Sequence, residues 1–107
     1  MVTAVERTRK WKLANPEKVI AQRLRGRQRV LDAYGGQCVC CGETDEAFLG
    51  IDHINGGGNR HRAEIGGGGN GLYLWLGRHG YPAGFQVLCH NCNQAKSRPV
   101  GCPHQKV

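Results

Sequence analysis

The sequence predicts a small α+β domain preceded by a basic N-terminal helix. Two short segments, residues 48–53 and 85–88, have the composition of strands. Apolar residues near the N-terminus instead recur at helical spacing. A chain of 107 residues has room for one small domain and an arm. With 39% hydrophobic and 7% aromatic residues its core must be thin, and such a core commonly needs a cross-link.

The first 34 residues are predicted to form a basic helical arm. They hold nine of the 15 Lys and Arg residues but only three of the eight acidic ones. Asn15 followed by Pro16 is typical of a helix start. Apolar residues then share one helical face, at spacings of four, seven and three: Ile20, Leu24, Leu31 and Tyr34. The Gly35-Gly36 pair ends this helix, and a shorter one is compatible with residues 4–13.

The charge of the arm indicates a polyanionic partner. The net charge of +7 and a pI near 9.4 fit nucleic acid. We expect phosphate contacts from one run of arginines: Arg23, Arg25, Arg27 and Arg29. The simpler alternative is a solvated amphipathic helix whose arginines face water.

The sequence also indicates the compartment. No apolar run approaches the roughly 20 residues that span a bilayer, so no membrane association is expected. The N-terminus lacks the apolar region of a secretory signal, so we expect a reducing cytoplasm. Six cysteines in such a compartment indicate a metal more than disulfides.

Two C-x-x-C pairs, Cys38 with Cys41 and Cys89 with Cys92, predict a four-thiolate zinc site. Each tight turn aims two thiolates at one point, and two turns complete a tetrahedron around Zn²⁺. A site closed in this way is structural rather than catalytic, and it would supply the missing cross-link. The alternatives are reduced cysteines packed in the core without a metal, and a redox pair.

Other candidate ligands are predicted not to bind this zinc. Cys40 lies beside Cys41, and adjacent side chains cannot both point inward. For Cys102 and His104, a packed C-terminal tail is favoured over a further half-site. His79 and His90 have no partner at an obvious spacing, so both are predicted to lie on the surface.

Residues 54–83 form a glycine-dense insert between the two strands. One interpretation is a flexible linker. The other is a backbone that approaches a ligand closely, such as a phosphate group. Within the insert, residues 72–76 form an apolar island that is predicted to make one or two docked helical turns.

The predicted zinc site would bring a His, a carboxylate and an amide close together. Asp52 and His53 end the first strand, and Asn93 is expected to begin a short helix after the last zinc cysteine. Carboxylate and amide oxygens are hard ligands that suit Mg²⁺, and a neutral His can accept a proton from water. This set suits phosphodiester hydrolysis. The alternative is a salt-bridged strand end in a plain zinc ribbon.

The motifs resemble those of the HNH endonuclease superfamily, and most of all small phage-type HNH proteins. They are Cys38-x-x-Cys41, Ile51-Asp52-His53-Ile54 and Val87-Leu88-Cys89-x-x-Cys92-Asn93-x-x-Lys96, within residues 35–104. The resemblance implies a ββα-metal core. It assigns the general base to His53 and the Mg²⁺ or Mn²⁺ ligands to Asp52 and Asn93.

The resemblance implies a metal-dependent DNA endonuclease that leaves 5′-phosphate and 3′-hydroxyl ends, in a phage or its bacterial host. Residues 1–34 would be the arm, and residues 35–107 the nuclease domain with insert 54–83. His61, Arg62 and Lys96 are predicted to touch nucleic acid. One position departs from the family pattern: Gly84 stands where a middle Asn braces the loop that carries the base. Either a residue of the insert replaces that brace, or glycine backbone geometry does.

Two other functions fit part of the pattern. A non-catalytic zinc-dependent nucleic-acid-binding module would keep the four cysteines without needing Asp52, His53 and Asn93. An RNA-binding or translation-associated zinc ribbon would fit the basic charge alone. A small nuclease has little room for a specificity domain, so a protein partner would have to supply any strict sequence preference. Oligomeric state is left open.

Overall fold

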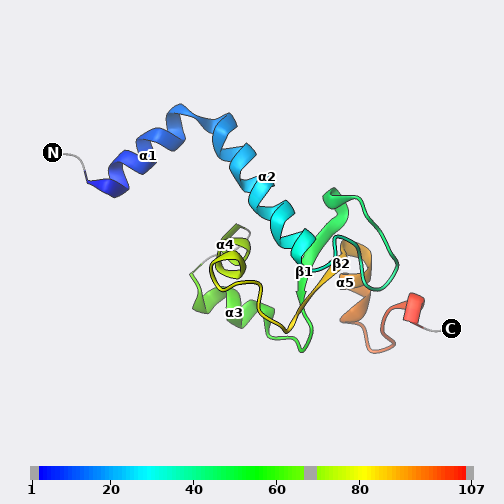
Figure 1. The fold of residues 1–107 in the computed structure, drawn as a ribbon. Helices are drawn as coiled ribbons and strands as arrows, with labels where there is room; N and C mark the ends of the chain where they lie inside the picture. The colour runs from blue at the N-terminus through cyan, green and yellow to red at the C-terminus, as the bar shows by residue number, and fades with distance from the viewer. Residues whose placement is uncertain (1–2, 67–69, 106–107) are drawn as a thin grey trace.

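A computed structural model describes residues 3–66 and 70–105 (Figure 1). These residues form five α-helices, two strands and two short 3₁₀ turns, which confirms the small α+β class. Two helices extend from the body as an arm, so the molecule measures 62 × 27 × 22 Å. Among the described residues, no helix has the length and apolar character needed to cross a membrane.

The sheet consists of two antiparallel strands, β1 (Leu49–His53) and β2 (Phe85–Cys89). Both lie where the sequence predicts strands. In their register Asp52 is opposite Gln86, and His53 is opposite Phe85. Successive side chains of a strand point to opposite faces, so Asp52 and His53 leave β1 on different sides.

The core lies around this sheet. Helix α5 (His90–Lys96) packs on both strands, and the last turns of α2 (Pro16–Ala33) pack on β1 and on α4 (Asn70–Arg78). The aliphatic core is short, as the composition predicts: Val30, Leu31, Leu49, Ile51, Leu72, Leu76, Val87 and Leu88. Cysteines complete it: Cys38, Cys89, Cys92 and Cys102 are also buried.

The arm consists of α1 (Ala4–Ala14) and most of α2. Thr3 and Glu6 form a reciprocal capping box at the start of α1, which buries no side chain. Asn15 ends α1, with its side-chain amide donating to the Trp11 carbonyl at 2.8 Å, and Pro16 begins α2. The predicted apolar face is only partly covered: Leu31 is buried, whereas Ile20 and Leu24 stay more than half exposed.

The insert is more structured than a linker. Its predicted apolar island lies within α4, which buries Leu72 and Leu76 against α2. A second helix, α3 (Gly58–Glu64), was not predicted, because its seven residues bury no side chain and have no apolar periodicity. The glycines at 67–69 lie outside the described residues.

Helix α5 begins earlier than predicted. The sequence places its start after Cys92, but the helix starts at His90 because Cys89 caps it. The Cys89 Sγ accepts a hydrogen bond from the Cys92 N–H at 3.4 Å. Asn93 is therefore the fourth residue of the helix rather than the first.

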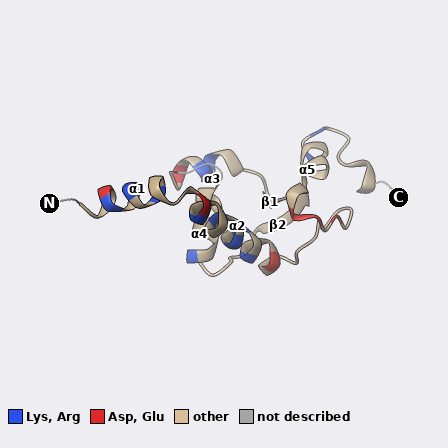
Figure 2. Cartoon of the chain, turned by 90° about the horizontal axis from the view of Figure 1, so that it is seen from above, with Lys and Arg blue, Asp and Glu red and all other residues tan. Residues whose placement is uncertain are grey.

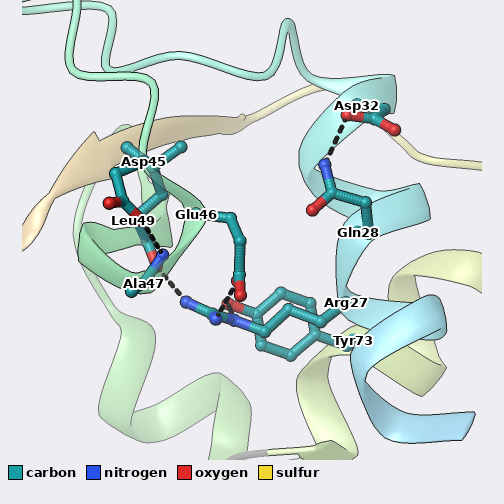
Figure 3. A network of polar contacts seen from close by, with 8 residues as sticks. All are labelled: Arg27, Gln28, Asp32, Asp45, Glu46, Ala47, Leu49 and Tyr73. Atoms are coloured by element: carbon teal, nitrogen blue, oxygen red, sulfur yellow. Dashed lines mark hydrogen bonds and ion pairs between the residues drawn. The ribbon is translucent and has the colours of Figure 1, made fainter. Parts of the chain in front are cut away.

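Arg27 joins the arm to the body (Figure 3). Its guanidinium donates to the Glu46 carboxylate at 2.6 Å, to the Leu49 carbonyl and to the Tyr73 hydroxyl at 3.4 Å. It thus links α2 to the start of β1 and to α4. Arg27 is one of the arginines predicted to contact nucleic acid; its side chain is half-buried and makes these intramolecular contacts, so that contact stays a prediction.

We expect Arg27→Gln to destabilise the protein more than a neighbouring arginine substitution does. Hydrogen bonds to charged groups contribute about 1.5–3 kcal/mol each, and partial exposure reduces this to about 1–2 kcal/mol in total. Arg29→Gln is the matched control, since Arg29 is exposed on the same helix and should cost less than about 0.5 kcal/mol. Denaturant unfolding of the two variants measures the difference, and equal midpoints would show that Arg27 is not a structural link.

Candidate functional site

The two C-x-x-C pairs meet, as predicted. The first turn is closed by the Gly42 N–H, which donates to the Cys38 carbonyl at 2.9 Å, and Gly42 has a φ of +81° that favours glycine. The Val39 N–H donates to the Val87 carbonyl at 3.0 Å, which fastens this turn to β2. The second pair spans the end of β2 and the first turn of α5.

The four sulfur atoms have the spacing of a metal site. Those of Cys38, Cys41, Cys89 and Cys92 all lie within 4.8 Å of one another, and the Cys41 and Cys89 Sγ atoms are 3.7 Å apart. A Zn–S bond of about 2.3 Å in a tetrahedron places sulfurs about 3.8 Å apart. The cluster is therefore compatible with a structural zinc ion.

The thiols of this cluster differ in how readily they ionise. Burial opposes ionisation of Cys38, yet hydrogen bonds from neighbouring backbone N–H groups outweigh burial and lower its thiol pKa to about 6. Burial and hydrogen bonding to the other cysteines raise the pKa of Cys92. A divalent metal would reverse this second effect, since it binds thiolates and releases their protons.

We expect Cys89→Ser to remove bound zinc and unfold the domain. Losing one ligand of a closed site forfeits much of an apparent metal-binding free energy of about 10–16 kcal/mol. Zinc content by elemental analysis and helicity by circular dichroism are the measurements. Val39→Ser is the control, because Val39 lies in the same turn with its side chain exposed. A folded, zinc-free wild-type chain would contradict this assignment.

A cleft of about 400 Å³ lies at the end of β1. The three residues predicted to carry chemistry, Asp52, His53 and Asn93, all line it, together with Arg62 and Lys96. Strand β1 supplies the first two and α5 supplies Asn93, so the convergence expected from the sequence is present in the geometry. None of the described residues of α2 lines this cleft, so the arginine run lies apart from it.

The Asp52 carboxylate has two polar partners on the α5 side of the sheet. The Lys96 Nζ lies 2.6 Å from its Oδ2, and the Gln86 side-chain amide donates to the same oxygen at 2.8 Å. Gln86 was not predicted as a site residue, although its position opposite Asp52 in the strand register could have indicated this contact. Both contacts use Oδ2, so Oδ1 receives neither of them.

The His53 imidazole lies on the opposite side, against aromatic rings. Its Nε2 is 2.9 Å from the Nδ1 of His61, and the Phe85 ring centroid is 4.9 Å away. The sequence analysis predicts a phosphate contact for His61, whereas the structure places its Nδ1 on His53. Burial is the largest influence on the His53 pKa and lowers it, and the charges of His61 and Arg62 lower it further.

The loop that carries His53 is braced by backbone and by Lys96. The Ile54 N–H donates to the Gly84 carbonyl at 3.0 Å, and Lys96 Nζ donates to the carbonyls of His53 and Ile54 at 3.1 and 3.2 Å. The Gly84 carbonyl therefore contacts this loop from the position where the resemblance implies an Asn side chain. Gly84 has a φ of +100°, which would strain any side chain placed there, including Asn.

Gly58 leaves space for the His53 ring. A Cβ atom at position 58 would lie 3.0 Å from the His53 Nδ1 and 3.2 Å from the Arg62 Nη1. Position 58 is in the wall of the cleft, so the Nδ1 edge of the imidazole lies against this wall, while the Nε2 edge faces His61. Here glycine lets the backbone of the insert approach a side chain of the same chain, whereas the predicted approach to a ligand stays a prediction.

We expect His53 to titrate below 6.5 in the zinc-loaded protein without Mg²⁺ or Mn²⁺. Burial and the positive charges of His61, Arg62 and Lys96 favour the neutral ring, and Asp52 only partly opposes them. His61→Asn should raise the pKa of His53 towards 6.5, whereas His79→Asn, just after α4, should leave it unchanged. Histidine NMR titration measures both, and a wild-type value at or above 6.5 would contradict the prediction.

Comparisons of the chain with family models, with curated proteins and with solved structures find no significant match in any of the three. The function of the chain must therefore be inferred from the residues of the cleft and their geometry.

Proposed function

We propose that this chain is a metal-dependent DNA endonuclease of the HNH type, with β1, β2 and α5 as its ββα-metal core. The observation that carries the proposal is the shared cleft of His53, Asp52 and Asn93. One group can accept a proton, and two can offer hard oxygen ligands. The adjacent cations Lys96 and Arg62 would attract a phosphate group to the same place.

The donor set fits a hard divalent cation. The Oδ1 of Asp52 is not the oxygen used by Lys96 and Gln86, and Asn93 is exposed at the cleft. Carboxylate and amide oxygens suit Mg²⁺ or Mn²⁺, so Asp52 and Asn93 would hold the ion. When bound, such an ion stabilises the negative charge that develops on the phosphate and on the leaving oxygen.

His53 would act as the general base through Nδ1. In the tautomer that this requires, its Nε2–H donates to the Nδ1 of His61, and the Nδ1 lone pair lies on the side of Gly58, at the cleft wall. The imidazole takes a proton from water as the water oxygen bonds to phosphorus. The bond between phosphorus and the 3′ oxygen then breaks, and that oxygen takes a proton from solvent. His61 is thus a positioning residue for the base.

The arm would bind the DNA backbone. Lys and Arg residues recur along α1 and α2 (Figure 2). Apart from Arg27, those of the arm are exposed: Arg7, Arg9, Lys10, Lys12, Lys18, Arg23, Arg25 and Arg29. Contacts of this kind do not depend on sequence and weaken with salt. The charge therefore supports DNA as the partner and leaves strict sequence preference to a further protein.

One observation favours a second candidate, a non-catalytic zinc-dependent nucleic-acid-binding module. The 2.6 Å ion pair between Lys96 and Asp52 is what a purely structural strand end would also show. Such a module would bind DNA through the arm and would not need His53 to be neutral.

We expect the wild-type chain to nick supercoiled plasmid with Mg²⁺ or Mn²⁺ and to leave 5′-phosphate ends. His53→Ala should lower the rate about 10²–10⁴-fold at every metal concentration, because a proton acceptor is missing. Asn93→Ala should be partly rescued by more metal, because a ligand is missing. The measurement is nicking rate against metal concentration, with end sequencing.

Matched controls separate catalysis from binding and folding. Gln94→Ala changes the residue beside Asn93, and His79→Ala changes an exposed histidine just after α4, so both should keep wild-type rates. Equal rates for wild type and His53→Ala would exclude His53 as the base. Tight DNA binding by wild type, with no cleavage on any tested DNA, would establish the non-catalytic module instead.

A further inference from the structure

A second group of metal ligands lies beside the first. The side chains of Cys40, Cys92, Cys102 and His104 bring their ligand atoms within 4.8 Å of one another. The C-terminal segment lies next to α5, which brings the last two of these ligands to the cluster (Figure 1). Cys102 is buried.

Cys40 is absent from the first cysteine group, as the sequence predicts, but it belongs to the second group. Adjacent cysteines cannot both aim at one metal, and here they do not. Cys41 points to Cys89, with 3.7 Å between the sulfur atoms, whereas Cys40 points to Cys102 at 3.5 Å. The Cys38–Cys41 turn therefore directs one sulfur towards Cys89 and another towards Cys102.

A tight turn after α5 directs Cys102 to this place. The Arg98 N–H donates to the Ala95 carbonyl at 3.1 Å, and the Gly101 N–H donates to the Arg98 carbonyl at 2.9 Å. Gly101 has a φ of +71°, which reverses the chain at low cost for glycine. The 3₁₀ turn Pro103–Gln105 then places His104 on the same point.

The distances are close to those of tetrahedral zinc coordination and slightly shorter. The Nδ1 of His104 lies 3.3 Å from the sulfurs of both Cys92 and Cys102. Bonds of about 2.3 Å to sulfur and 2.0–2.1 Å to nitrogen place such atoms about 3.5–3.8 Å apart. The 3.5 Å between Cys40 and Cys102 is far longer than a disulfide bond of about 2.05 Å. Three cysteines and one histidine form a common zinc ligand set.

We propose that these four residues bind a second zinc ion, and that the Cys92 thiolate bridges it to the first. Cys92 belongs to both groups, so two ions must share its sulfur. The charges balance, because the second ion brings two positive charges while Cys40 and Cys102 bring two thiolates and His104 stays neutral. The second ion would fasten the C-terminal segment to α5, and this inference does not depend on the proposed nuclease function.

The test is the metal content of the full-length chain, purified with zinc under reducing conditions. Native mass spectrometry should find two zinc ions per wild-type chain. His104→Ala and Cys102→Ser should each lose one ion and keep the helicity of the folded domain. His90→Ala is the control, because it removes an exposed histidine of α5 beside the first site, and it should keep both ions.

Replacing zinc with ¹¹³Cd tests the bridge. Two NMR resonances that are coupled to each other through the Cys92 sulfur would confirm it, and His104→Ala should abolish one of them. One zinc ion per folded wild-type chain would overturn the proposal, whether Cys40 and Cys102 are then thiols or a disulfide. Two ions in both His104→Ala and Cys102→Ser, or two uncoupled resonances, would overturn it as well.

Discussion

The meeting of two cysteine pairs, 48 residues apart between Cys41 and Cys89, is the contact on which the rest of the fold depends. A two-stranded sheet is marginal by itself in water, and the aliphatic core around it is short. Closing a loop of this length costs chain entropy that such a core cannot easily offset. A metal held by the cysteines would supply the difference and would make folding conditional on metal supply.

The same contact positions the cleft. Helix α5 is capped by Cys89 of the cysteine cluster, and its fourth and seventh residues, Asn93 and Lys96, line the cleft at the end of β1. Lys96 then holds both the Asp52 carboxylate and the backbone after His53. The cysteine cluster and the cleft are thus two ends of one short helix, so a disturbance of the first is transmitted to the second over a few ångströms.

The sequence predicted the elements with strong local signals. Paired cysteines, the Asn15-Pro16 helix start and the alternating strands all carry their geometry in a few neighbouring residues. Contacts between distant residues were not predictable: Arg27 with Glu46, His53 with His61, and Cys40 with Cys102. Each contact depends on how segments far apart in the sequence pack together. The residues next to a charged, imidazole or thiol side chain do not indicate which distant partner it will contact. The role of Asp52, His53 and Asn93 stays a prediction, although the structure places them in one cleft.

Helix α2 runs without a break from the exposed arm into the core, and Arg27 fixes it there. Its 18 residues span about 27 Å at 1.5 Å per residue. A rigid rod of that length, anchored beside β1, would act as a ruler on DNA. Under the proposed function, phosphates held along the rod would cover up to about eight base pairs, at 3.4 Å per base pair. The length of DNA that α2 contacts would then be set by helix length, independently of base sequence.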